Sequence, residues 1–278
     1  MAKKKKVQYR DPRTCIFCAG PRDSREHVAP DWMKPLLHGY NGTIHWIAEG
    51  NKPPLAGALN KPGDHRGRRI RCVCVPCNTG WMSRLQSVAR QDIEPLVRGQ
   101  SVYLSAARRR RIASWATMFC MVYEQADDVD TQTTTQALRQ SFKANQTPPP
   151  DWFFWIGHHR DPQHPKRFTV NRRSWATNAG PAGEPRCQMT VALIAGMVIC
   201  AMYVPPSFQE SPTLLPAVRR CAASFRLQEV WPEPAWQLPS AIGSALHWLR
   251  TRRRNERYFT GSDFRKVFAE MGECISFA

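Results

Sequence analysis

The sequence is poor in acidic side chains. Its 278 residues include 22 Asp and Glu against 40 Lys and Arg, which gives a formal net charge of +18. This imbalance favours a polyanionic partner, because each phosphate that Lys or Arg neutralises releases condensed counterions. We therefore expect a nucleic acid as the partner. A basic protein without such a partner, or one that binds a membrane surface peripherally, is the alternative.

The sequence also lacks an apolar run of membrane-spanning length. The longest run, residues 189–204, is shorter than the ~20 residues that a membrane helix needs, and Gly196 interrupts it. A secretory signal is missing too, since the lysine-rich residues 1–6 have no apolar stretch after them. These absences predict a cytoplasmic protein with no membrane partner. Hydrophobic residues make up 42% of the chain, which is enough to build packed cores.

The length of the chain predicts more than one domain. We expect a flexible basic arm (1–12), a first domain (13–99) and an accessory α+β domain (100–278) whose function is unassigned. In the first domain, alternation predicts strands at 43–48 and 69–75, and helical spacing predicts a helix from Asn78 that Pro95 and Gly99 close. In the accessory domain the pattern predicts helices at 111–124, 132–143, 240–255 and 262–271, and strands at 152–158, 167–170, 187–195 and 197–204.

Ten cysteines would suit a disulfide scaffold, but in a chain without a secretory signal closely spaced cysteines favour metal. Cys15 and Cys18 form one C-x-x-C pair, and Cys74 and Cys77 form another. Each pair makes a tight knuckle, and two knuckles complete a tetrahedral Cys₄ zinc site of structural type. Unligated cysteines are the alternative reading, and Cys72 is an alternative ligand at strand spacing from Cys74.

Three polar residues lie beside these knuckles. Glu26 and His27 follow the first pair, and Asn78 follows the second directly. Alone, a histidine is usually just a hydrogen-bonded side chain, and Asn78 is well explained as the N-cap of its helix. Their shared position beside a zinc site would instead bring all three together in space.

This combination resembles the HNH endonuclease family, the ββα-metal or His-Me finger nucleases. The zinc-stapled branch of that family has a C-x-x-C knuckle, an acidic-His pair with an apolar residue and proline after it, and then a strand leading into C-x-x-C-Asn and the finger helix. Here the corresponding residues are Cys15 and Cys18, Glu26-His27-Val28-x-Pro30, and Cys74, Cys77 and Asn78. Trp32 and the Cys-Asn-x-Gly-Trp-Met segment also look like a bacterial and phage subgroup. The resemblance covers about residues 13–95.

The resemblance implies the chemistry of the site. His27 would be the general base that takes a proton from the attacking water, as its ordinary pKa near neutrality suits. Glu26 and Asn78 would bind one catalytic Mg²⁺ or Mn²⁺ through oxygen, which such ions prefer. Zinc would be structural. The family usually also has an asparagine before the second knuckle that braces the loop of the base; residues 68–73 contain none, and Asn60 is the nearest candidate.

Arginines cluster in three places. Arg66, Arg68, Arg69 and Arg71 precede the second knuckle and are expected to hold phosphates. Arginines at 108–111 open a helix, and others at 250–254 end one. At 250–254 the positive charge suits the helix dipole, so a structural role there is as reasonable as a nucleic-acid one. Tryptophans such as Trp152 and Trp155 could stack on bases, although a core position is the commoner fate.

The sequence thus predicts a metal-dependent endonuclease that hydrolyses the phosphodiester bonds of DNA, with RNA as an open alternative. A zinc-stabilised nucleic-acid-binding module without catalysis is one rival. Another is a defence effector whose finger cuts only after a protein partner activates it. Homodimer formation is also left open.

Overall fold

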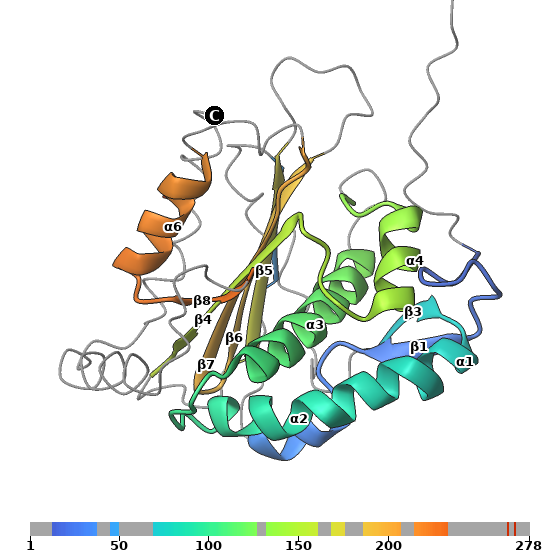
Figure 1. Cartoon of the computed structure of the whole chain (residues 1–278). Helices are drawn as coiled ribbons and strands as arrows, with labels where there is room; N and C mark the ends of the chain where they lie inside the picture. The colour runs from blue at the N-terminus through green and yellow to red at the C-terminus, as the bar shows by residue number, and fades with distance from the viewer. Residues whose placement is uncertain are drawn as a thin grey trace, which may run out of the picture.

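The chain folds into a layered α+β structure (Figure 1). The computed structural model describes residues 13–37, 45–49, 69–126, 132–160, 168–175, 186–206 and 214–232, together with Lys266 and Glu270. The predicted basic arm 1–12, Asn60, Arg66, Arg68, helix 240–255 and most of helix 262–271 lie outside these residues.

The first unit is a short ribbon followed by a long helix. Strands β1 (Ser24–His27) and β3 (Arg69–Val73) pair antiparallel, and η1 (Asp31–Leu37) follows β1. After β3 the chain turns into α1 (Val75–Cys77), η3 (Asn78–Met82) and α2 (Ser83–Val97). Gly99 ends this helical run with a φ of 74°, a conformation that glycine adopts without steric cost. The unit therefore has a strand–strand–helix order.

The second unit is a six-stranded sheet with strand order β2-β5-β6-β7-β4-β8. Five strands form its antiparallel part, and β2 joins β5 in parallel at one edge. The strands are β2 (His45–Glu49), β4 (Trp152–His158), β5 (Phe168–Trp175), β6 (Cys187–Ile194), β7 (Met197–Tyr203) and β8 (Gln228–Trp231). Because β2 lies in the segment between the two halves of the ribbon, that segment reaches the sheet of the second unit.

Helices cover both faces of this sheet. One face packs under α3 (Ala106–Tyr123), and the opposite face packs under α6 (Leu214–Ser224). Alternate residues of β4 divide between the two cores: Phe154 belongs to the α3 side, and Phe153 and Trp155 to the α6 side. All residues of β6 and β7 are buried, as expected for central strands covered on both faces. Trp152 and Trp155 are therefore core residues.

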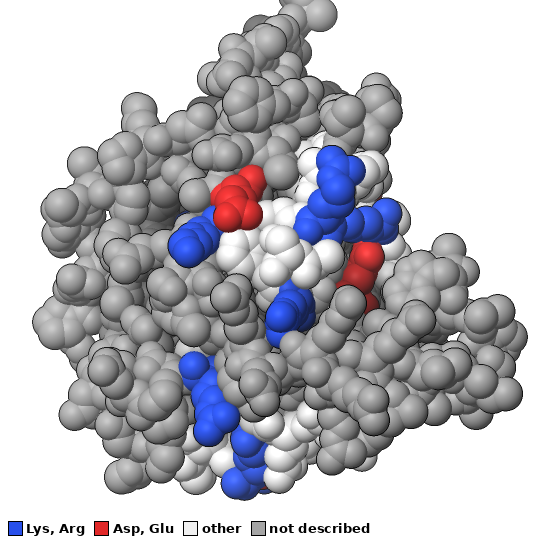
Figure 2. All heavy atoms as spheres, turned by 90° about the vertical axis from the view of Figure 1, so that its left-hand side faces the viewer, with Lys and Arg blue, Asp and Glu red and all other residues white. Residues whose placement is uncertain are grey.

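The face that carries α6 shows how charge is distributed away from the ribbon. Figure 2 looks onto this side of the molecule, and its described Lys and Arg side chains are scattered with Asp and Glu among them. One pair on this side joins Arg219 of α6 to Glu229 of β8 at 3.0 Å. Among the described residues, this face has no continuous basic patch.

The α+β class is confirmed, and the six predicted strands correspond to β2 to β7. The helix at 111–124 begins earlier, at Ala106, because the Ser105 side chain accepts from the Arg108 backbone N–H. Likewise α4 (Gln136–Asn145) begins after the cap Thr135 rather than at 132. Strands β1 and β8 were not predicted from residue patterns, because they have only four residues each. Helix α6 was not predicted either.

The first unit is tied firmly to the sheet. The Gly196 N–H donates to the Val97 carbonyl at 2.9 Å, and a Cβ on Gly196 would lie 2.4 Å from the Gly99 nitrogen. Asp92 of α2, only 1% exposed, accepts from Arg108 and Arg111 of α3 at 2.7 and 2.6 Å. One hydrophobic core runs from the cysteine loop through α2 and α3 to the sheet.

Candidate metal centre and catalytic site

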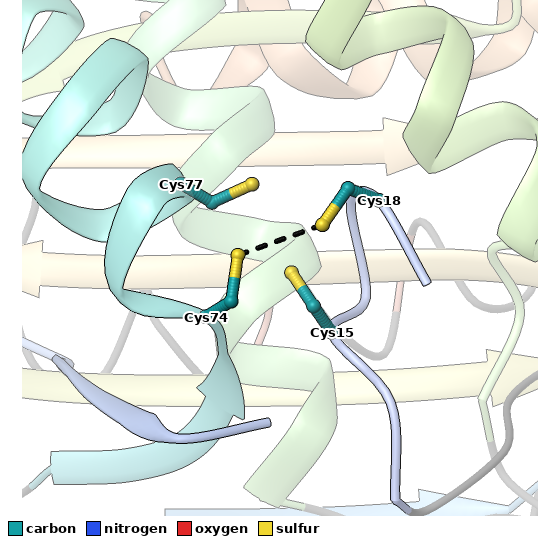
Figure 3. Close-up of side chains that lie close together, drawn as sticks. All are labelled: Cys15, Cys18, Cys74 and Cys77. Atoms are coloured by element: carbon teal, nitrogen blue, oxygen red, sulfur yellow. Dashed lines mark hydrogen bonds between the residues drawn. The ribbon is translucent and has the colours of Figure 1, made fainter. Parts of the chain in front are cut away.

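Four cysteines converge where the loop before β1 meets the start of the helical run (Figure 3). The Sγ atoms of Cys15, Cys18, Cys74 and Cys77 all lie within 4.8 Å of one another, and Cys18 and Cys74 are 3.5 Å apart. Cys72 is buried but is not part of this group. The arrangement fits a tetrahedral zinc site, and the choice between Cys74 and Cys72 falls on Cys74.

Local backbone geometry shapes the first knuckle. The Cys15 N–H donates to the Gly20 carbonyl at 2.7 Å, and the Ala19 N–H donates to the Cys15 carbonyl at 3.0 Å. Ala19 has a φ of 59°, an uncommon conformation for a residue with a side chain. In the second knuckle the Val75 N–H donates to the Asp23 carboxylate at 2.8 Å, which fastens the helix start to the residue before β1.

Burial works against ionising these thiols when no cation is present. It raises the pKa of Cys15 and of Cys77. At Cys18 burial also acts in that direction, but the Gly20 backbone N–H and the neighbouring thiols outweigh it, so the pKa of this thiol is lowered. A cation such as zinc would hold the buried Cys15 and Cys77 as thiolates, and its binding would then be coupled to folding.

Asn78 braces β1 against the helix. Its amide nitrogen donates to the Ser24 hydroxyl at 2.8 Å and to the Arg25 carbonyl at 3.1 Å. Because a carbonyl can only accept, the contact with the Arg25 carbonyl identifies the amide atom that faces the strand as the nitrogen. The helical run is capped at Cys74, so Asn78 is not its N-cap. The side-chain oxygen of Asn78 is then the atom that a metal would use.

Glu26 lies on the buried face of β1. It is 5% exposed, and Gln86 of α2 donates to its Oε1 at 2.6 Å. Burial raises the pKa of the Glu26 carboxyl to about 7, and the nearby Asp31 carboxylate adds to the shift. A buried carboxylate with one amide partner is a strong oxygen donor for a cation, but a proton competes for it near neutral pH.

His27 is half-buried at the end of β1. Arg69, its cross-strand neighbour, donates from Nε to the His27 Nε2 at 2.7 Å, and the Asp31 Oδ1 lies 3.1 Å from the same nitrogen. Burial lowers the pKa of His27, and Arg69 and Lys34 lower it further, against the opposing effect of Asp31. The lowered pKa favours the neutral imidazole, and in the contact with Arg69 its Nε2 is the accepting atom.

A narrow pocket opens between β1, α2 and α3. Glu26, His27 and Gln86 contribute its polar lining, and Trp115, Met118 and Phe119 are among its apolar lining residues. Its free volume of about 10 Å³ corresponds to roughly one water molecule. The pocket is too small for an organic ligand.

The predicted arginines divide between the ribbon and positions that the structure does not describe. Arg69 and Arg71 are exposed on β3, whereas Arg66 and Arg68 lie outside the described residues. Arg25 of β1 is a further exposed basic residue, paired in register with Arg71. The residue patterns did not single it out, although its position two residues before His27 on a strand is a usable signal.

The arginines at 108–111 have structural partners instead. Arg108 and Arg111 bind Asp92, and Arg109 donates to the carbonyls of Leu104 and Glu229 at 3.0 and 2.5 Å. These contacts tie α3 to α2 and to β8. The contacts indicate a structural role for Arg108, Arg109 and Arg111.

Comparisons with models of protein families, with curated proteins and with solved structures gave no match. The resemblance to HNH nucleases consequently rests on the motif residues alone. None of the helices among the described residues combines the length and the hydrophobicity needed to cross a membrane.

Proposed function

We propose that the protein is a metal-dependent endonuclease that hydrolyses phosphodiester bonds of DNA. The observation that carries the proposal is the position of His27. This neutral imidazole lies on an exposed ribbon face among Arg25, Arg69 and Arg71, and the ribbon is stapled beside a four-cysteine cluster. A base surrounded by cations is suited to a substrate that carries negative charge on the oxygens bound to the atom to be attacked.

His27 would act through Nε2. A water molecule held there loses its proton to Nε2 as its oxygen forms a bond to phosphorus, and the bond from phosphorus to the 3′ oxygen breaks. Arg69 occupies Nε2 at 2.7 Å, so its guanidinium must turn from the imidazole to a phosphate oxygen when substrate binds. Such an exchange replaces a neutral acceptor by a charged one, which makes the hydrogen bond stronger.

Glu26 and Asn78 would hold the catalytic Mg²⁺ or Mn²⁺. A carboxylate and an amide oxygen are donors of the right kind. When bound, the ion offsets charge on the scissile phosphate and on the departing oxygen. Glu26 must give up its proton for this role, since its pKa is raised to about 7. Asn78 can keep its contacts with Ser24 and Arg25 while its oxygen faces the ion. The Cys₄ group would hold zinc as a structural ion.

The test uses supercoiled plasmid with the zinc-loaded protein, with Mg²⁺ or Mn²⁺ and with EDTA. We expect nicking or linearisation that requires the added metal. His27→Ala should lower the rate by roughly 10²–10⁴, the usual contribution of a general base, with unchanged zinc content and melting temperature. Arg220→Gln on α6, an exposed residue remote from the ribbon, is the control and should cut normally. Cleavage by His27→Ala at the wild-type rate would refute the role of His27.

A second candidate is a zinc-stabilised nucleic-acid-binding module without catalysis. Two hydrogen bonds favour it: Arg69 donates to the basic nitrogen of His27, and Gln86 donates to the Glu26 carboxylate. The same plasmid experiment separates the candidates. Salt-sensitive DNA binding with no cleavage under any metal condition supports the binding module, or a nuclease that needs an activating protein partner.

A further inference from the structure

The exposed face of the β1–β3 ribbon is lined by basic residues. Arg25 stands directly opposite Arg71, and His27 stands directly opposite Arg69. The three arginines are exposed, whereas Glu26 and Ile70 between them are buried at 5% and 8% exposure. Side chains alternate along a strand, so the two opposite pairs share the outward face.

The opposition of Arg25 and Arg71 is unfavourable for the ribbon alone. Like charges directly opposite on antiparallel strands destabilise the pairing. On α2, by contrast, Arg90 and Arg98 both form ion pairs with Glu94. In the described part of the chain, neither Arg25 nor Arg71 forms an ion pair. Strand β1 has only four residues. An anion bound between Arg25 and Arg71 would offset the repulsion within this short strand pair.

We propose that Arg25 and Arg71 form a binding site for one backbone phosphate of the nucleic acid, next to the scissile phosphate. This inference rests on the proposed function and names the part of the same face that positions the substrate. The two guanidiniums approach a phosphate from opposite strands, and each presents a fork of N–H donors that matches phosphate oxygens.

The spacing along the ribbon suits this arrangement. Two residues of a strand span roughly 6.8 Å, so the arginine pair lies about that far from the pair of His27 and Arg69. Neighbouring phosphates of one DNA strand are separated by a similar distance through space, because the rotation of the helix adds to their rise of roughly 3.4 Å along its axis. A phosphate held by Arg25 and Arg71 is then next to a phosphate at His27. Contacts of this kind set the register of the substrate and read no sequence.

The experiment measures binding separately from cleavage. A short fluorescent DNA duplex is titrated with zinc-loaded protein without added Mg²⁺ or Mn²⁺, at salt concentrations between about 50 and 200 mM. The variants are Arg25→Gln, Arg71→Gln and the double variant, beside Arg220→Gln as a control with the same change of charge. Thermal melting of each variant without DNA is recorded in parallel.

We expect the double variant to lose one phosphate contact, which lowers the slope of log affinity against log salt by roughly 0.9. Because the two arginines share one phosphate, the losses in log affinity of the single variants should sum to more than the loss of the double variant. Melting temperatures should stay equal or rise, since a repulsion is removed. Arg220→Gln should match the wild type.

Three results would overturn the proposal: a double variant that binds like Arg220→Gln, strictly additive single losses, or a ribbon that melts earlier in each single variant. The outcomes also separate this site from the nuclease activity. DNA binding that depends on both arginines, in a protein that never cleaves, supports the phosphate site and refutes the proposed catalysis. Cleavage with an unchanged salt slope in the double variant refutes the phosphate site alone. A wild type that binds no DNA refutes both.

Discussion

Arginines cluster both on the β1–β3 ribbon and around the buried end of α3, but their charges are balanced differently in the two places. On the ribbon, Arg25 and Arg71 oppose each other at the surface without an acidic partner among the described residues. At the end of α3, Arg139 and Arg172 are buried at 0% and 1% exposure and share one carboxylate, Glu124.

In the buried group, which we call the Glu124 cluster, the Glu124 carboxylate accepts hydrogen bonds from several residues. Glu124 accepts from the Thr134 N–H and the Thr133 hydroxyl at 3.0 Å each, and its other oxygen accepts from the Thr134 hydroxyl. Arg172 of β5 reaches both Glu124 and Gln188 of β6 at 3.3 Å. The cluster therefore joins α3, α4 and the sheet.

The difference between the regions is one of solvent. A buried charge without a partner costs several kcal/mol, so a buried arginine needs a carboxylate or another acceptor beside it. An exposed charge loses little when it has no protein partner, and it stays available for a ligand. Exposed arginines without a carboxylate partner therefore indicate a binding role, whereas buried arginines paired with a carboxylate indicate a role in holding the fold together.

The largest effect should follow loss of the zinc site. Cys77→Ser removes one ligand from a group whose metal binding is worth roughly 10–16 kcal/mol in small zinc-dependent folds. We expect loss of zinc by metal analysis and loss of amide protection in β1 and β3 by hydrogen exchange. The central strands β6 and β7 should stay protected, because both faces of the sheet are covered. A fully folded, metal-free Cys77→Ser protein would refute the zinc assignment.

The next effect concerns the Glu124 cluster. Glu124→Ala leaves Arg139 and Arg172 buried without their carboxylate, which should cost about 3–5 kcal/mol of unfolding free energy. Arg25→Gln on the ribbon serves as the matched control and should cost nothing. Chemical denaturation measures both. Equal stability of the two variants would remove the distinction between the buried and the exposed arginines.

The smallest effect depends on pH and tests the buried carboxyl of the ribbon. The pKa of Glu26 is raised from 4.5 to about 7, so the folded state binds the proton more tightly than the unfolded chain. Its stabilising contribution is complete below the unfolded pKa and disappears as pH rises through the folded pKa. Between pH 5.5 and 8 this group should account for a loss of about 2 kcal/mol.

Glu26→Gln isolates this contribution. The lowered pKa of His27 acts in the opposite direction, since its protonation favours the unfolded chain as pH falls, and both proteins share that effect. The difference in unfolding free energy between wild type and Glu26→Gln, measured with zinc bound and no other divalent ion, should therefore change across this pH window. A difference that does not change with pH would contradict the burial of Glu26.

The residue patterns predicted what local chemistry can specify. Two C-x-x-C pairs predicted the four-cysteine group, and apolar runs predicted β4, β6 and β7 with ends within a residue. Patterns failed where tertiary contacts decide. Strand β1 is too short to show an alternation, and it exists because Ile70 and its neighbours on β3 pair with it. The caps Ser105 and Thr135 placed helix starts that apolar periodicity put elsewhere.

The sequence by itself determined the excess of positive charge, the α+β class and the identity of the four clustered thiols, because composition, periodicity and knuckle spacing are local properties. Only the tertiary structure decided which arginines are surface residues and which are buried with a carboxylate. It also decided that Asn78 braces β1, that Arg69 contacts His27 and that Arg25 opposes Arg71. These contacts join residues 42 or more positions apart, and such long-range pairs depend on how the whole chain closes around its core.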